Sequence, residues 1–249
     1  MSSHYPDSEI QKDYTIAVEI DSYTHASPKS SSKRIKDIYG TARKGGLSEE
    51  NAKLLEEFLR TIMETLMVPP SWIPLEHIEI DEKKIYEICE DILNKDGRLL
   101  DITFGPRIGK LSRVISSKRN LMSFDEWMIC IIVQLAILLK GLMNLSFAPI
   151  GVAQKIINLL IKDLWSQNQV ALVLLPWLHI PLDRASLSHI DPKQIHHWKA
   201  WTKAELDITT LVEYWQIQLT VRSFHRRLGV FRSPMALDQL WWTTLQIKP

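Results

Sequence analysis

Two stretches of the chain place an amine and a carboxylate where helices are expected to begin. Lys155 lies in the first turn of a predicted helix, after a hairpin that contains glycine. Asp183 follows the tripeptide Ile-Pro-Leu at 180–182 and enters the next predicted helix. An unprotonated amine is a nucleophile, and a carboxylate stabilises developing positive charge. These residue types are therefore suited to nucleophilic and electrostatic catalysis.

The same stretches resemble the DNA glycosylases of the helix-hairpin-helix superfamily, whose pattern is a hairpin Gly-Val-Gly-x-Lys followed later by Pro-Val-Asp. The resemblance covers about residues 123–190. Alanine stands in place of the second glycine, and the lysine and aspartate are 183 − 155 = 28 residues apart, so an extra loop is expected near 167–175. Residues 153–184 are also similar to a pattern in uncharacterised bacterial proteins, which implies no function. The matching residues are Gly151-Val152-Ala153-Gln154-Lys155 and Pro181-Leu182-Asp183.

The resemblance implies a protein that flips a base out of DNA and cleaves its N-glycosidic bond. Asp183 would stabilise the positive charge that builds up on the sugar, and Lys155 would capture C1′ as a Schiff base, which adds a lyase activity. The hairpin would present backbone N–H groups to a DNA phosphate. Neither a cofactor nor a metal is expected. The candidate nucleic-acid contacts are Gly151, Ala153, Gln154, Asn158, Lys162, Arg184, Arg226 and Arg227.

Ordinary structural roles compete with each of these assignments. Most lysines are solvated surface residues, so Lys155 is equally expected on an exposed helix face. Asp183 has the position of a plain helix N-cap, which does not prevent it from facing a pocket. Asn158 and Lys162 continue a polar stripe from Lys155, and such stripes usually face solvent. Arg184 either binds phosphate or pairs with a neighbouring acid.

A cluster of histidines and aspartates at 179–197 is a second candidate, for a metal site. It lacks the helical i, i+4 histidine pair of zinc hydrolases and has no cysteine nearby, so a histidine-rich surface loop is the favoured interpretation. Its members are His179, Asp183, His189, Asp191, His196 and His197.

Tryptophans are frequent in the last quarter of the chain and lie close to arginines. Their rings could stack on an extruded base or hold a strand, whereas a tryptophan-rich core with snorkelling arginines is the structural alternative. Trp241 and Trp242 cannot both point inward from one helix. The residues concerned are Trp198, Trp201, Trp215, Trp241 and Trp242, with Arg222, Arg226, Arg227 and Arg232.

The composition is that of an average globular protein. The 249 residues include 30 Lys and Arg against 29 Asp and Glu, and 45% are hydrophobic, which excludes fibrous, disordered and disulfide-stapled classes. The two cysteines, Cys89 and Cys130, lack CxxC spacing and fit a reducing compartment. Residues 1–14 do not resemble a secretion signal, and the longest apolar run, 128–139, is too short to span a bilayer. We expect a cytoplasmic protein without a membrane contact.

Helical periodicity dominates the chain after residue 50. The sequence predicts a mainly α, multi-helix domain over 47–249 with a helix-hairpin-helix-like element, preceded by a flexible or loosely packed segment over 1–46. A short strand is expected at 14–20, although it has no evident partner. Ser123 and Glu126 form a capping-box sequence. Helices are expected at 48–67, 81–93, 124–140, 151–165, from about 183, at 203–226 and at 234–245.

Two other functions remain open. The first is a non-catalytic nucleic-acid-binding module, in which the basic stretches 29–44 and 222–232 contact phosphates. The second is a helical protein-interaction subunit that uses exposed tryptophans as anchors.

Overall fold

The computed structural model describes residues 47–68, 82–100, 123–182, 184–190 and 206–246, and every regular element among them is helical. The mainly α prediction is therefore confirmed. The strand expected at 14–20 and the segment 1–46 lie outside the described residues. The elements are α3 (Glu49–Met67), α4 (Glu82–Leu100), α6 (Phe124–Leu142), α7 (Ile150–Ser166), the 3-10 helix η1 (Leu172–Trp177), α8 (Arg184–Ile190), α10 (Ile208–Leu228) and α11 (Pro234–Gln246).

Capping side chains define the starts of α3 and α6. Ser48 accepts a hydrogen bond from the Asn51 backbone N–H at 3.2 Å. Ser123 and Glu126 form the complete capping box, in which each side chain accepts from the backbone N–H of the other residue. The sequence prediction for both helix starts is confirmed, because an oxygen at the cap satisfies N–H groups that the helix itself leaves unpaired.

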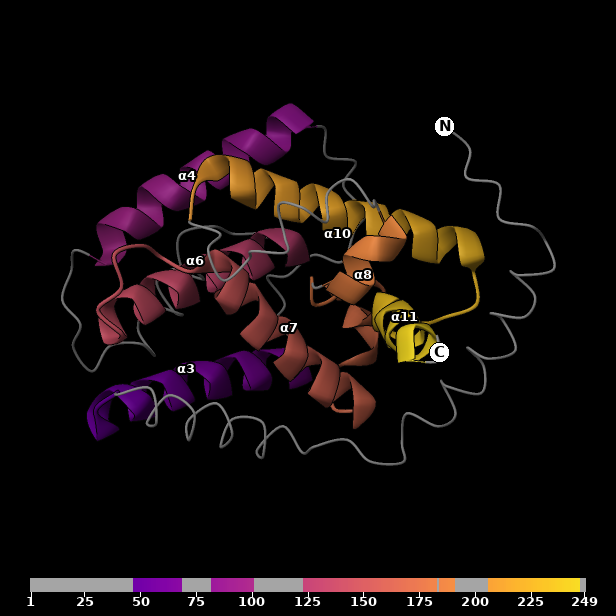
Figure 1. Ribbon diagram of the computed structural model, residues 1–249, viewed down its shortest axis with the longest axis horizontal. Helices are drawn as coiled ribbons and strands as arrows, with labels where there is room; N and C mark the ends of the chain where they lie inside the picture. The colour runs from indigo at the N-terminus through magenta and orange to yellow at the C-terminus, as the bar shows by residue number, and fades with distance from the viewer. Residues whose placement is uncertain (1–46, 69–81, 101–122, 183, 191–205, 247–249) are drawn as a thin grey trace.

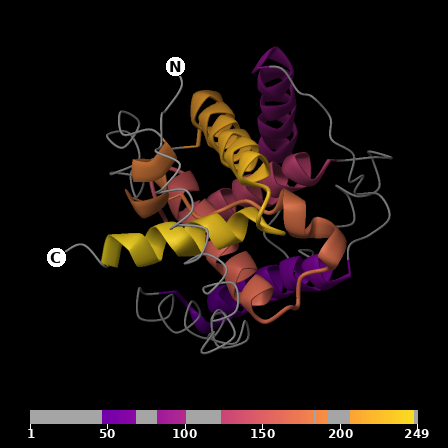
Figure 2. The same ribbon diagram turned by 90° about the vertical axis from the view of Figure 1, so that its right-hand side faces the viewer.

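The helices pack in layers around α6 and α7, which contact each other extensively (Figure 1). On one side, α10 packs against α4, and α4 in turn packs against α6. On the other side, α3 packs against α7. Figure 2 shows the same order from the side, with α3 and α4 on opposite faces of the molecule. Near one end, α8 and η1 pack on α11.

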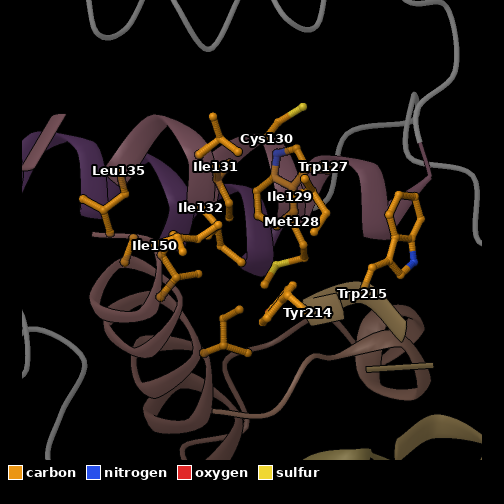
Figure 3. Packing of buried hydrophobic residues seen from close by; sticks show 14 of the residues in the cluster. Trp127, Met128, Ile129, Cys130, Ile131, Ile132, Leu135, Ile150, Tyr214 and Trp215 are labelled. Carbon is orange, nitrogen blue, oxygen red and sulfur yellow. The ribbon is translucent and has the colours of Figure 1, made fainter. Parts of the chain in front are cut away.

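Helix α6 forms the centre of the core. It is apolar almost all round, and most of its residues from Phe124 to Leu139 are buried. Figure 3 shows its side chains packed beside Ile150 of α7 and Tyr214 of α10. Among the residues that the structure describes, no helix combines the length and the apolar character that a bilayer crossing needs.

Two predicted helix boundaries are wrong. Helix α4 was expected over 81–93, but it continues through Gly97 to Leu100, because one glycine lowers helix stability by only about 1 kcal/mol relative to alanine. Helix α10 was expected to begin at Lys203, but it begins at Ile208, where the Asp207 side chain accepts from the Thr210 backbone N–H at 2.7 Å. The loop expected at 167–175 contains the start of η1.

Candidate functional site

Lys155 lies in the second turn of α7 and is half-buried. The helix begins at Ile150, so the residues expected to form a hairpin are already helical. Residues 148–151 are buried, and the Leu206 backbone N–H donates to the Ala148 carbonyl oxygen at 3.1 Å. Asp183, the expected partner of Lys155, lies outside the described residues.

The neighbours of Lys155 and Asp183 in the chain are bonded to each other. The side-chain amide of Gln154 donates to the Leu182 carbonyl oxygen at 3.1 Å and accepts from the Leu182 backbone N–H at 3.2 Å. Gln154 directly precedes Lys155, and Leu182 directly precedes Asp183. The amide bridge therefore joins the start of α7 to the segment that leads into α8.

A second glutamine bridges the same buried segment from the opposite helix. Gln218 of α10 accepts from the Ile180 backbone N–H at 3.0 Å and donates to the Ile180 carbonyl oxygen at 2.9 Å. Ser186 donates to the Pro181 carbonyl oxygen at 3.0 Å. Residues 178–182 are buried and form no helix or strand, so their backbone polar groups need partners from side chains. The two glutamines and the serine supply them.

His179, in the middle of this segment, connects two side chains inside the core. Its Nε2 lies 2.7 Å from Asp125 Oδ1 on α6, and its Nδ1 lies 2.9 Å from the Tyr214 hydroxyl on α10. The same hydroxyl accepts from the Asn158 amide at 3.0 Å, and that amide also donates to Gln154 at 3.1 Å.

The partners of His179 define its protonation. Burial lowers the pKa of His179, so its ring is neutral near pH 7. Because the ionised Asp125 carboxylate can only accept, the single ring hydrogen lies on Nε2, and Nδ1 accepts the hydroxyl proton of Tyr214. Nε2 donates this ring hydrogen to Asp125. Burial also raises the pKa of Tyr214, which keeps its hydroxyl protonated.

Asp125 binds the only arginine that the described part of the chain buries in its core. Its Oδ2 accepts from the Arg222 guanidinium and, at 3.2 Å, from the Trp215 indole N–H. Burial alone would raise the pKa of Asp125, but Arg222 and His179 together hold it well below its usual range. The carboxylate is therefore charged and balances the Arg222 charge.

Several predicted nucleic-acid contacts lie inside the protein instead. Gln154 and Asn158 are 0% exposed and use their amides on internal partners, so the solvent-facing stripe is wrong for Asn158. Gly151 and Ala153 are also buried, and the Ala153 backbone N–H donates to the Pro149 carbonyl within α7. In this conformation none of the four presents a polar group to a phosphate. Burial is the reason, because the start of α7 is covered by other parts of the chain.

The predicted basic contacts have different environments. Lys162 forms an ion pair with the buried Asp238 of α11 at 2.6 Å, so its charge is already balanced. Arg226 is exposed and lies over the Trp177 ring, 5.7 Å from its centre. Arg227 is exposed and lies over Phe224 at the same distance. Arg184 begins α8, and its side chain lies outside the described part of the structure.

Only some members of the predicted aromatic and histidine clusters lie among the described residues. Trp215 and Trp241 are buried, and Trp241 stacks on the exposed His189 with ring centres 5.4 Å apart. No tryptophan whose side chain is described is exposed, so the expected tryptophan anchors are absent from that part of the chain. Within the described residues no group of three or more His, Cys, Asp or Glu side chains could hold a metal ion.

Sequence inspection missed the residues at the centre of this network. The sequence motifs point to none of Asp125, Tyr214 and Gln218. A signal was present, because polar side chains at i, i+4 spacing on an otherwise apolar helix face must find partners when they are buried. Residues 154 and 158 have this spacing on α7, and residues 214, 218 and 222 have it on α10.

Comparison with known proteins identifies no relative. No protein-family model, no curated protein and no solved structure matches the chain. The resemblance to DNA glycosylases therefore rests on the motif residues alone.

Proposed function

We propose that this protein is a DNA glycosylase-like enzyme with Lys155 as nucleophile and Asp183 as electrostatic partner. The observation that carries the proposal is the double hydrogen bond between Gln154 and Leu182, since these residues precede the two catalytic candidates. An amide that pairs with both the N–H and the C=O of one residue fixes a short distance between the two chain segments. The half-buried position of Lys155 fits an amine that meets a substrate at the protein surface.

The chemistry needs only an amine, a carboxylate and DNA. The unprotonated Nζ of Lys155 forms a bond to C1′, while the bond from C1′ to the base breaks and the base leaves with the bonding electrons and takes up a proton. Asp183 stabilises the positive charge on the sugar during this step. Loss of the Nζ proton and opening of the sugar ring then give an imine, which borohydride reduces to a stable amine.

Arg226 and Arg227 are the phosphate contacts that this proposal retains. Arg226 lies 12 residues beyond Tyr214, and Arg227 lies 12 residues beyond Trp215. Twelve residues correspond to about 18 Å along the axis of α10. One DNA strand covers that distance with about five nucleotides at 3.4 Å per nucleotide. A strand bound by the arginines therefore needs about five nucleotides to reach the level of Tyr214 along α10.

Borohydride trapping tests the proposal directly. DNA that carries an abasic site or a damaged base is incubated with the protein and borohydride, and we expect a covalent protein–DNA adduct at Lys155. Lys155→Ala should abolish the adduct, whereas Lys140→Ala, which removes an exposed lysine of α6, should leave its yield unchanged. An adduct that survives Lys155→Ala, or no adduct with any substrate, would refute the lysine mechanism.

Such an enzyme would act in the cytoplasm. Cys89 and Cys130 are buried thiols outside any disulfide, which fits a reducing compartment.

A non-catalytic nucleic-acid-binding module is the second candidate, and the arginines of α10 favour it. Residues 214–237 contain Arg222, Arg226, Arg227 and Arg232 and no acidic residue. Arg222 is balanced by Asp125, while Arg226, Arg227 and Arg232 are exposed. Guanidinium groups held over rings are preordered for phosphate binding.

Salt dependence tests the phosphate contacts of this candidate, and the trapping assay separates it from the enzyme. The logarithm of the DNA-binding constant should fall linearly with the logarithm of the salt concentration. The double variant Arg226→Ala/Arg227→Ala should reduce the slope of this line by about two, since each lost phosphate contact removes about one unit. Binding of this kind without any borohydride adduct would favour the module over the enzyme.

A further inference from the structure

The buried polar side chains around Tyr214 form one continuous chain of hydrogen bonds. It begins at the Asp125 carboxylate, passes through the His179 ring to the Tyr214 hydroxyl, and continues through the Asn158 amide to Gln154. Gln154 then holds the backbone of Leu182. Three helices, α6, α7 and α10, contribute to this chain.

The Tyr214 hydroxyl determines which groups donate and which accept along this chain of hydrogen bonds. Its hydroxyl has one hydrogen, which goes to His179, and it accepts one hydrogen from Asn158. Asn158 therefore directs both of its contacts through its NH₂ group, toward Tyr214 and toward Gln154. The Gln154 oxygen accepts from Asn158, which turns its own NH₂ group toward the Leu182 carbonyl.

One buried polar atom without a hydrogen-bond partner shows that this arrangement has an energetic cost. Asn158 Oδ1 is buried and has no hydrogen-bond partner among the described residues. A buried acceptor without a partner is unfavourable, and each such case in a folded protein calls for an explanation. The explanation that fits here is that the amide orientation is required by its two donor contacts.

We propose that Tyr214 is a positioning residue that holds the Leu182 backbone against the start of α7 through Asn158 and Gln154. The inference rests on the proposed function, because Gln154 and Leu182 directly precede the two catalytic candidates. Tyr214 is itself fully buried, and its hydroxyl bonds to His179 and Asn158.

The variant Tyr214→Phe tests this role, because it removes the hydroxyl and keeps the ring. Amide hydrogen exchange of Leu182 should become at least tenfold faster, since its N–H is held by Gln154. The Ile180 N–H is held by Gln218 instead and should change less than twofold. In trapping assays with abasic DNA, the maximal rate should fall at least tenfold while the half-saturating DNA concentration stays unchanged.

A further variant makes the exchange result specific. Gln154→Met should speed exchange at Leu182 and not at Ile180, because Gln154 bridges Leu182 and Gln218 bridges Ile180. If Tyr214→Phe fails to fold, Asn158→Leu breaks the same chain at its next residue and should speed exchange at Leu182; unchanged exchange in that variant overturns the inference. Tyr86→Phe removes the hydroxyl of an exposed tyrosine on α4 and should leave both exchange and trapping unchanged.

The outcomes distinguish this inference from the proposed function. Unchanged Leu182 exchange in Tyr214→Phe overturns the inference, and so does faster exchange with an unchanged trapping rate. Absence of an adduct from the wild-type protein refutes the enzyme proposal and with it the catalytic purpose of the positioning. The exchange data then still decide whether Tyr214 holds the segment that contains Leu182.

Discussion

Asp125 is the residue whose charge the core depends on most. Its carboxylate accepts hydrogen bonds from His179, Trp215 and Arg222, and it balances the buried guanidinium of Arg222. Two other Arg222 nitrogens, Nε and Nη1, have no hydrogen-bond partner in the described part of the structure. Loss of the carboxylate would leave this guanidinium buried without a counter-charge.

Asp125→Asn is therefore expected to destabilise the protein by about 3–5 kcal/mol, the cost of breaking a buried ion pair from one side. Urea or guanidinium unfolding measures it. Glu56→Gln is the matched control, because it breaks the surface pair with Arg60 and should cost less than about 1 kcal/mol. Equal small effects of both variants would show that Asp125 does not carry a buried charge.

The buried histidines predict a dependence of stability on pH. Burial lowers the pKa of His179 and of His225 in the folded protein, so below the ordinary value of 6.5 the unfolded chain binds more protons than the folded one. The free energy of unfolding should fall as the pH drops from 7 to 5. The slope is at most about 1.4 kcal/mol per pH unit for each histidine.

Asp125 adds a second decline at lower pH. Its pKa is held below the ordinary 3.8, so its contribution is present above that value and is lost as the pH falls further. Denaturant unfolding at a series of pH values measures both declines. A flat profile between pH 7 and 5 would contradict the neutral, buried state of His179.

At the scale of elements, Gly229 ends α10 in a conformation that other residues adopt with strain. Its φ is +65°, in the left-handed region, and an added Cβ would meet no atom closer than 3.9 Å. Gly229→Ala should therefore destabilise by about 1 kcal/mol through backbone strain alone. Gly141→Ala, at an exposed helical position in α6, should instead stabilise by about 0.5–1 kcal/mol. Thermal unfolding that shows the same sign for both would contradict this account.

Most helices could be predicted from the sequence because their signals are local. Ser123 and Glu126 define a helix start within four residues, and the apolar periodicity of α3 shows which face it buries. The start of α10 could not be predicted, because Thr202 and Asp207 are both good caps and only the folded chain selects between them. The continuation of α4 through Gly97 could not be predicted either, because a glycine weakens a helix without ending it.

The candidate site was less predictable because its contacts join distant parts of the chain. Lys155 and Asp183 were found from the types and spacing of neighbouring residues. The bonds that hold this region span 28 residues from Gln154 to Leu182 and 54 residues from Asp125 to His179. No periodicity within one helix contains that information, and the partner of a buried polar residue becomes known only when the helices are packed.

For the whole molecule, the ion pair between Lys162 and Asp238 connects the middle of the chain to its last described helix. It joins α7 to α11, and the lysine side chain is only 18% exposed while the aspartate is 0% exposed. Lys162→Met should cost about 1–3 kcal/mol, since it leaves a buried carboxylate without this partner.

Amide hydrogen exchange shows which helices the Lys162→Met substitution destabilises. Amides of α11 should exchange faster in Lys162→Met, and amides of α3 should not, because α3 packs on α7 without a contribution from this pair. Lys53→Met, which removes an exposed pair with Glu49 within α3, is the control and should change neither. Uniform loosening of both helices would show that the pair stabilises the whole fold and does not dock α11 in particular.

Carbodiimide cross-linking tests most directly whether Lys155 and Asp183 converge. The reagent joins an amine to a carboxylate only when the two groups are in contact, and peptide mass spectrometry identifies the products. We predict an isopeptide bond between Lys155 and Asp183, formed alongside the bond between Lys53 and Glu49, whose groups lie 3.2 Å apart. A reaction that joins Lys53 to Glu49 but leaves Lys155 unlinked, or links it only to other carboxylates, would contradict the proposed site.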